Sequence, residues 1–296
     1  MEKTKFARIE YIFAMIIYGT CGIFSKYINV SSGFIVFSRA IIGSLILALF
    51  LLIRKRKINF ESIKKNFKWL VLSGVSIGLN WMCLFSSYNY VSVSVASFCN
   101  YLAPAFFIIV MIIIFKEKTS FTKIICLLIA LVGILLLSGV IGKDNTVNYI
   151  GIILGILAAL FYVCLLVFNR FIKDIDPVEK VLIEMIFVAI VTAPYAFISL
   201  DYNSVVFDGK TIIFLLILGV FHTGFAYILY LGSMEFLPSQ SIAIYSYFEP
   251  IVAVILSYFL LKEDLSILGL IGGVLILSST FLYEILNIRE KKKLVE

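Results

Sequence analysis

The sequence is poor in charge, because only 15% of its 296 residues are Asp, Glu, Lys or Arg, against about 25% in a typical soluble domain. Hydrophobic residues make up 62% of the chain. A chain of this composition has too few polar residues to cover an apolar interior, which excludes an ordinary soluble protein. Lipid is therefore the expected solvent, and an all-α membrane protein is the expected class.

The sequence also lacks the residues of common enzyme sites. His222 is its one histidine, and its five cysteines form no CxxC pair, which excludes a His/Cys metal cluster. No HExxH, GxSxG or nucleotide-binding P-loop motif occurs. We therefore expect no enzyme activity, no cofactor, no metal and no direct ATP drive. The cysteines are expected to be free thiols packed within the membrane.

Apolar runs follow one another along the chain, each about 20 residues long, which is the length that crosses a bilayer as a helix. Ten runs qualify, and the short connections leave no room for a sizeable soluble domain. The runs are residues 9–28, 33–53, 69–89, 91–115, 121–141, 149–169, 177–199, 211–232, 238–261 and 266–286. The sequence thus predicts ten transmembrane helices.

The net charge of +7 follows the topology of such a chain rather than a nucleic-acid surface. With ten crossings both termini share one side, and 20 of the 25 Lys and Arg residues would lie there. Only Lys143, Lys210 and Lys262 would lie on the other side. Because cytoplasmic loops retain basic residues, we expect cytoplasmic termini in a multi-pass protein of the plasma (cytoplasmic) membrane, the inner membrane of the cell. We expect no nucleic-acid partner, and the oligomeric state stays open between monomer and homodimer.

The sequence repeats itself after 146 residues. The stretch "CNYLAPAFFIIVMIIIFKEK" from Cys99 aligns without a gap on "YSYFEPIVAVILSYFLLKED" from Tyr245. The same offset places Gly78 on Gly224, and an offset of 145 places Arg39 on Glu184. We interpret this pattern as a five-helix unit used twice, in residues 1–145 and again in residues 146–296.

Because five is odd, the second unit must enter the membrane upside down. Residues 116–118, Lys-Glu-Lys, end a helix of the first unit, whereas the equivalent residues 262–264 are Lys-Glu-Asp. The more basic end is expected in the cytoplasm and the less basic end outside. Inverted repeats of this kind place a substrate site near the middle of the bilayer, between the two halves.

These twin segments resemble the drug/metabolite transporter superfamily, in its ten-helix EamA-type branch. The resemblance rests on "LAPAFFIIVMIIIFKEK" and "FEPIVAVILSYFLLKED", each followed by an apolar, glycine-containing span, and it covers essentially the whole chain. It implies two inverted five-helix repeats (5+5), a central cavity and transport of a small metabolite. Export of amino acids or related compounds is frequent in that superfamily.

Glu249 is the first candidate for chemistry, because a charge in the middle of a span is costly and needs a reason. Ser241, Tyr245 and Glu249 are spaced by four residues and would share one helix face. Glu249 would carry a proton or bind a substrate amine there. The alternative is a hydrogen bond to a neighbouring helix that only fixes packing.

Three further ionisable residues are candidates for coupling or gating. Arg39 would reach Glu249, clamp a substrate carboxylate or extend to the outer headgroups. Glu184 lies at a different depth and would either contribute to coupling or pair with Lys180 four residues before it. His222 suits proton exchange, but a lone histidine in a helix often makes a single structural hydrogen bond.

Small polar residues form stripes on the third and fourth spans, and lipid would reject these faces. Asn80 and Asn100 are their largest members and are the expected substrate contacts. Aromatic residues beside the stripes would form a wall that stacks a planar substrate or holds a cation, with plain packing as the alternative. The expected wall consists of Tyr18, Trp81, Tyr101, Tyr245 and Tyr247.

Pro104 and Pro250 occupy equivalent positions in the two units and remove a backbone donor, so they are candidate flex points for alternating access. The sequence as a whole predicts a secondary active transporter of a small metabolite. Its leading substrate class is an amino acid or related compound for export, with proton coupling as an open option. The alternative substrate is an organic cation, such as a quaternary amine, held by tyrosines and Glu249.

Overall fold

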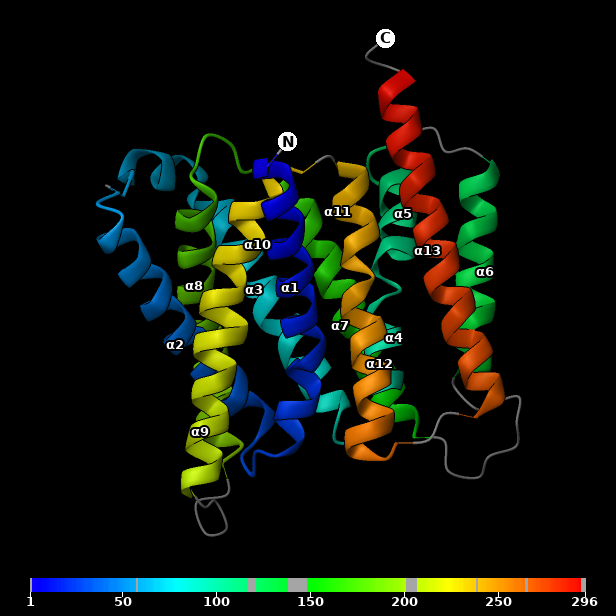
Figure 1. Ribbon diagram of the computed structural model, residues 1–296, viewed down its shortest axis with the longest axis horizontal. Coiled ribbons are helices and arrows are strands. Elements are labelled where there is room, and N and C mark those ends of the chain that lie inside the picture. Colours follow the sequence, from blue (N-terminus) through cyan, green and yellow to red (C-terminus); the bar gives the residue numbers. More distant parts are fainter. Residues whose placement is uncertain are drawn as a thin grey trace.

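The computed structural model describes residues 2–56, 58–116, 121–137, 148–200, 207–237, 239–263 and 266–293. Four of the charged residues compared above, namely Glu117, Lys118, Lys143 and Asp264, lie outside these ranges. The described residues form helices joined by short connections, and both ends of the chain lie at the same end of the helix bundle (Figure 1).

The first repeat contains α1 (Glu2–Lys26), α2 (Ser32–Ile53), α3 (Phe60–Ser87), α4 (Val93–Asn100), α5 (Ala103–Ile113) and α6 (Phe121–Leu137). The second contains α7 (Tyr149–Asn169), α8 (Pro177–Ile198), α9 (Gly209–Ile217), η1 (Leu218–Phe225), α10 (Ala226–Met234), α11 (Ser239–Ser246), α12 (Phe248–Leu261) and α13 (Ile267–Lys293). These bounds follow the ten predicted spans closely.

Six helices in the described ranges are long and apolar enough to cross a membrane, and one of them is the continuous rod of α9, η1 and α10. The other crossings are shorter apolar helices. They consist of α6, α13 and two end-to-end pairs, α4 with α5 and α11 with α12 (Figure 1). The prediction of an all-α membrane protein with two inverted five-helix repeats is confirmed.

The two repeats pack in the same way at equivalent glycines. A Cβ atom on Gly78 of α3 would come within 2.9 Å of Val191 in α8, and one on Gly224 of η1 within 2.5 Å of Ile46 in α2. Val191 and Ile46 are themselves 145 residues apart. The third helix of each repeat therefore presses on the second helix of the other repeat, as an internal two-fold relation requires.

The helix ends also match between repeats. Lys116 follows α5 with φ 51°, and Lys262 follows α12 with φ 54°. These two lysines are 146 residues apart, and a left-handed backbone is uncommon for residues other than glycine. The turn that ends the fourth span of each repeat therefore has the same backbone geometry in both halves.

The fourth and ninth spans are broken helices rather than continuous ones. The breaks fall at Tyr101, between α4 and α5, and at the equivalent Tyr247, between α11 and α12 (Figure 1). Each break lies three residues before Pro104 or Pro250. A proline gives no N–H to the carbonyl four residues earlier, which interrupts the helical hydrogen bonds, and each proline instead lies in the first turn of the next helix. The predicted common face of Ser241, Tyr245 and Glu249 assumed one uninterrupted helix; the break places Ser241 and Tyr245 in α11 and Glu249 in α12, and the shared face stays a prediction.

The eighth span contains a π-helical segment, η1, which the apolar pattern does not reveal. Within it the hydroxyl of Thr223 donates to the carbonyl of Leu218, five residues earlier, at 3.0 Å. Such segments are rare and often occur at functional sites, because the wider turn redirects side chains. Here it directs His222 and Thr223 toward the interior, where both are buried.

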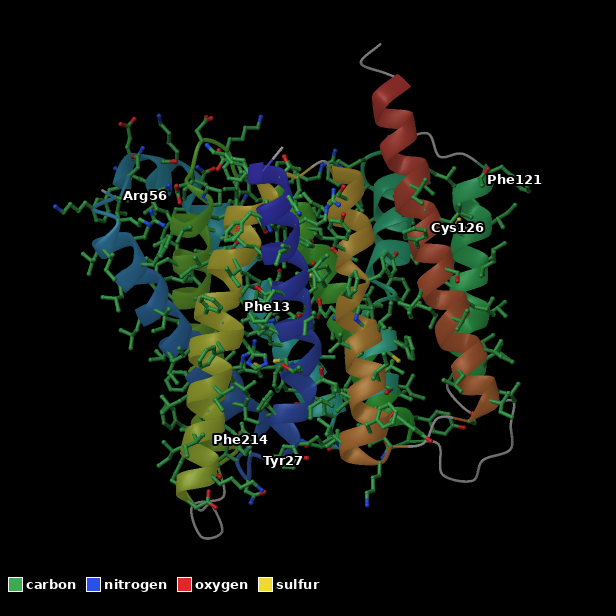
Figure 2. All side chains as sticks on the ribbon, viewed as in Figure 1. Phe13, Tyr27, Arg56, Phe121, Cys126 and Phe214 are labelled. Carbon is green, nitrogen blue, oxygen red and sulfur yellow. The ribbon has the colours of Figure 1, made fainter. Side chains whose placement is uncertain are left out.

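The bundle has two distinct ends. Arg56 lies at the end that carries the chain termini, whereas Tyr27 and Phe214 lie at the opposite end with their rings stacked at 5.5 Å (Figure 2). Helices α1, α3 and α7 run between these ends through the middle of the bundle, α12 occupies the half opposite the termini, and α6 and α13 pack together at one side (Figure 1). The middle of this arrangement holds the candidate site.

Candidate functional site

Glu249 lies in the first turn of α12, immediately after the break at Tyr247. Its side chain is half-buried, and no side chain caps the start of this helix. Helix α1 fixes the position of the turn, because a Cβ atom on Gly19 would lie only 2.6 Å from the backbone oxygen of Glu249. The carboxylate therefore sits at a helix N-terminus inside the bundle, where the helix dipole favours negative charge.

Side chains from several helices surround Glu249 closely enough to interact with it electrostatically. We name this set the tyrosine chamber. It consists of Tyr18 and Cys21 of α1, Tyr88, Tyr101, Tyr162 of α7 and Tyr227 of α10.

The rings of the tyrosine chamber differ in how far they are covered by neighbouring side chains. Tyr162 is 38% exposed although it lies among the interior groups Glu249, Tyr227 and Tyr230. Tyr18 closes another part of the wall, with its ring 5.8 Å from that of Tyr227 and 6.2 Å from that of Tyr230. A small organic molecule would thus meet mainly aromatic surface.

Two hydroxyl groups of the chamber have no hydrogen-bond partner in the described part of the chain. They belong to Tyr18 and Tyr101, and both oxygen atoms are buried. The Tyr101 hydroxyl lies beside the Glu249 carboxylate, close enough to interact with it, but the two do not meet hydrogen-bond geometry. Buried polar groups are nearly always satisfied, so these hydroxyls are available to a ligand.

Arg39 reaches the same region from α2 and is only 3% exposed. Its Nε donates to the Thr223 hydroxyl at 3.2 Å, and its guanidinium lies 4.2 Å from the ring centre of Trp81. No carboxylate lies within ion-pair distance among the residues described, and the side chain does not extend to the membrane surface. Its two terminal nitrogens have no hydrogen-bond partner among the residues that the structure describes, so they remain available to an anion.

Arg39 and Glu249 act on the same neighbours. Both interact electrostatically with four members of the chamber, and these are Tyr18, Cys21, Tyr88 and Tyr227. The two charges come from different repeats and do not form an ion pair with each other. The tyrosine chamber consequently has a positive and a negative pole.

His222 is buried and bonded at both ring nitrogens. Its Nε2 lies 2.7 Å from the Thr20 hydroxyl of α1, and its Nδ1 lies 3.3 Å from the carbonyl of Ile217. A carbonyl can only accept, so Nδ1 carries a hydrogen. The Thr20 hydroxyl also lies 2.7 Å from the carbonyl of Ile17, and its single hydrogen can serve only one of these two contacts. This arrangement ties η1 to α1, and a role in coupling stays a prediction.

Glu184, the repeat mate of Arg39, is bonded differently from the local pairing considered above. Its carboxylate accepts a hydrogen bond from Ser73 of α3, while Lys180 donates to Asn169 at 3.3 Å. Tyr227 is close enough to interact electrostatically with the Glu184 carboxylate, so Glu184 lies near the chamber. Arg39 and Glu184 each contact the third span of the opposite repeat, and their role in coupling or gating stays a prediction.

The remaining predicted contacts are spread more widely. Both amide hydrogens of Asn80 are engaged, at 3.0 Å with Asn100 and at 2.8 Å with the carbonyl of Ala158, which ties α3 to α4 and α7. The ring of Tyr245 lies 6.4 Å from that of Tyr11, and Arg8 lies 5.9 Å from its centre. The ring of Tyr247 packs against Phe281 at 5.3 Å. Contact of these residues with substrate stays a prediction.

The structure thus brings Tyr18, Tyr101, Glu249 and Arg39 together, with Trp81 beneath the guanidinium. Sequence reasoning missed four members of the set, namely Cys21, Tyr88, Tyr162 and Tyr227. None of these belongs to a polar stripe, and tyrosines that line a cavity look like those that face lipid or packing. The alignment of Trp81 with Tyr227 at offset 146 is the one signal that could have included Tyr227.

Comparison with known proteins follows the same division of the chain. The sequence model of the EamA-like transporter family matches residues 9–139 and again residues 149–284. The predicted boundary at residue 145 lies between these two matches and itself stays a prediction. A solved crystal structure shares the fold with a TM-score of 0.66 and 16% identity, covering 96% of this chain and 98% of that one.

Similar curated proteins carry the name of transporters. The uncharacterized transporter YxxF of Bacillus subtilis (strain 168) is 27% identical over 261 residues, which cover 86% of this chain and 82% of that protein. The uncharacterized transporter YoaV of the same organism is 23% identical over 248 residues, covering 82% and 84%. An uncharacterized transporter of Archaeoglobus fulgidus is 24% identical over 245 residues, covering 82% and 85%.

The two family matches cover most of the chain, and the helices repeat where the matches repeat. The resemblance noted in the twin proline segments is therefore confirmed at the level of the family. The chain belongs to the EamA-like transporter family of the drug/metabolite transporter superfamily, and it is a multi-pass membrane transporter rather than an enzyme.

Proposed function

We propose that the protein is a secondary active transporter that binds a zwitterionic amino acid or a closely related compound in the tyrosine chamber and exports it by alternating access. The observation that carries the proposal is the pair of opposite charges, Arg39 and Glu249, which border one chamber without neutralising each other. A zwitterion is the ligand that such a dipolar space fits.

The contacts of a bound amino acid follow from the donors and acceptors present. The free guanidinium nitrogens of Arg39 would hold the carboxylate, since this fork matches a carboxylate in two parallel hydrogen bonds. Glu249 would receive the ammonium group, with the hydroxyls of Tyr18 and Tyr101 as further partners. The side chain would lie on the rings of the chamber, which suits apolar or aromatic groups.

An organic cation is the second candidate substrate. Glu249 and the surrounding tyrosines form the combination of carboxylate and aromatic faces that binds quaternary amines. Arg39 counts against this candidate, because its buried charge acts on the same four chamber residues and would repel a second cation. The amino acid is therefore the leading substrate.

Proton coupling through Glu249 is part of the proposal. The residue lies at a helix break, between the two repeats, where alternating access would expose it to each side in turn. The Glu249→Gln variant removes the titrating group and keeps the shape. Transport by this variant at the normal rate, with an unchanged dependence on pH, would refute the coupling.

The orientation proposed from the charge pattern places the termini in the cytoplasm of a plasma-membrane protein. Arg56 lies at the end that carries the termini (Figure 2), and the start of α3, with Lys65, and the end of α7, with Arg170, are joined to the same end by the Arg56–Asp176 and Asn66–Lys173 contacts. The opposite end has Lys26, Lys210 and Lys262, so Lys26 joins the small basic group there. The excess of basic residues at the end with the termini supports cytoplasmic termini, because basic loops are retained in the cytoplasm.

Counterflow into proteoliposomes distinguishes the two substrate classes. Vesicles preloaded with an unlabelled neutral amino acid should accumulate the same amino acid in labelled form from outside. Vesicles preloaded with an unlabelled quaternary amine should not accumulate the labelled amine. Accumulation of the amine alone would replace the leading proposal with the second. Accumulation of neither compound in vesicles that contain folded protein would refute both.

A further inference from the structure

Glu263 joins three elements at the end of the bundle opposite the termini. The left-handed backbone of Lys262 turns the chain after α12, so that the Glu263 carboxylate folds back toward the helix. Its Oε2 accepts from the Ser257 hydroxyl at 2.5 Å and from the backbone N–H of Val93 at 2.8 Å. Because Val93 begins α4, Glu263 of the second repeat caps a helix of the first.

Lys26 adds α1 to the same contact. Its Nζ lies 3.9 Å from Oε1 of Glu263 and donates a hydrogen bond to the backbone oxygen of Tyr88. Gly22, one turn earlier, allows close approach, since a Cβ atom there would lie 2.5 Å from Val93 and 3.1 Å from the ring of Tyr88. The ends of α1, α4 and α12 are thus drawn together around one carboxylate.

Tyr88, a member of the tyrosine chamber, also joins this contact, because its backbone oxygen accepts from Lys26. Its ring is buried and close enough to Cys21 and Glu249 to interact with them. On its other side, residues 88–92, Lys26 and Glu263 line a surface pocket of about 320 Å³. Tyr88 therefore borders both the outer pocket and the other members of the chamber, and the Glu263 contacts fix the helices around it.

The elements that meet at Glu263 can move separately. α4 ends at the break before Tyr101, and α12 begins at the break after Tyr247. Each is a half-helix attached through a non-helical residue, and half-helices of this kind rearrange in transporters with inverted repeats. Opening at this end requires loss of the Glu263 contacts to Val93 and Lys26.

We propose that Glu263 is the latch of a gate at the end opposite the termini, with Tyr88 as the plug that it holds closed. Release of the carboxylate from Val93 and Lys26 lets α12 move away from α1 and α4 and connects the tyrosine chamber with that side of the membrane. The inference concerns access to the chamber and holds for either substrate class.

Cys21 reports the state of this gate, because it lies within the chamber. The reference protein carries Cys83, Cys99, Cys126 and Cys164 replaced by alanine, so that Cys21 is its single thiol. A membrane-impermeant maleimide is applied to reconstituted protein from the side opposite the termini. Labelling should be slow in the reference protein and at least about 5-fold faster in Glu263→Gln, because the amide weakens both the Lys26 attraction and the helix cap.

Two further variants make the test specific. Ser257→Ala removes one contact of the latch and keeps Glu263, so it should give a smaller increase in labelling. Glu235→Gln removes an exposed carboxylate at the other end of the bundle and should leave the rate unchanged. Equal labelling of the reference and Glu263→Gln proteins, or an equal increase in Glu235→Gln, would overturn the latch. The readout requires no substrate, so it is independent of the proposed function.

Discussion

Arg39 and Glu249, one from each repeat, border the same chamber and do not pair with each other within the described structure. Buried charges are normally paired, because desolvation otherwise outweighs any gain. Two charges of opposite sign that act on the same side chains without pairing are therefore best explained by a ligand that satisfies both. The following predictions test this arrangement and the fold that supports it.

The hydroxyl of Tyr18 tests whether unpartnered groups serve a ligand. Tyr18→Phe should weaken substrate binding about 5- to 10-fold, since one lost hydrogen bond is worth about 1 kcal/mol. The unliganded protein should be as stable as before or more so, because a buried unsatisfied hydroxyl disappears. Thermal unfolding with and without substrate measures both effects. Tyr258→Phe, an exposed position, is the control, and a loss of stability with unchanged binding would contradict the prediction.

Gly19 tests the close contact that positions Glu249. Gly19→Ala places a methyl group 2.6 Å from the backbone oxygen of Glu249, and backbone cannot yield without shifting α1 or α12. We expect at least a 10-fold lower transport rate and lower stability. Gly232→Ala adds the same methyl group where no atom lies within 4 Å and should be neutral. Equal transport by the two variants would show that the α1–α12 contact does not set the site.

Asn80 tests a structural role against direct binding. Asn80→Ala removes the hydrogen bonds to Asn100 and Ala158, and we expect it to lower the free energy of unfolding by about 1–3 kcal/mol. Ser44→Ala, at an exposed hydroxyl, should cost much less. Denaturation in detergent measures both variants. Unchanged stability of Asn80→Ala, together with loss of substrate binding, would favour the direct contact predicted from the sequence.

The orientation is tested by single cysteines at the two ends of the bundle. Arg56→Cys lies at the end with the termini, and Lys210→Cys lies at the opposite end. In intact cells an impermeant thiol reagent should label the second and not the first, because basic loops stay in the cytoplasm. The reverse pattern would place the termini outside.

The sequence predicted the parts of the fold that the bilayer dictates. Span length follows from membrane thickness, and the offset of 146 residues identified the inverted halves, so the helix bounds agreed closely. The breaks at Tyr101 and Tyr247 were not predicted. A proline shows where a helical hydrogen bond is lost, but the packing of neighbouring helices determines whether the helix kinks or breaks there. The π-helical segment around His222 depends likewise on packing against α1 and α2.

The sequence singled out site candidates most readily where their chemistry is exceptional within a membrane. Glu249 and Arg39 stood out because charge there is costly, and the structure brings both to one chamber. Tyr162 and Tyr227 did not stand out, since tyrosine also serves packing and the membrane surface. The possible pairing of Glu184 with Lys180 was inferred from their spacing within one helix. In the structure Glu184 instead accepts a hydrogen bond from Ser73, which belongs to another helix.

The central claim is that Glu249 holds the amine and Arg39 the carboxylate of one zwitterion. The most direct measurement is the affinity of purified wild-type, Glu249→Gln and Arg39→Gln proteins for a substrate amino acid, its deaminated acid and its decarboxylated amine. Wild type should prefer the amino acid over both analogues by about 10-fold or more, the magnitude of one charge-assisted hydrogen bond. Glu249→Gln should no longer distinguish the amino acid from its deaminated acid but should still prefer it over the decarboxylated amine. Arg39→Gln should no longer distinguish the amino acid from the amine but should still prefer it over the acid. If both variants retain both preferences, the two charged side chains do not bind the charged groups of the substrate, and the account is contradicted.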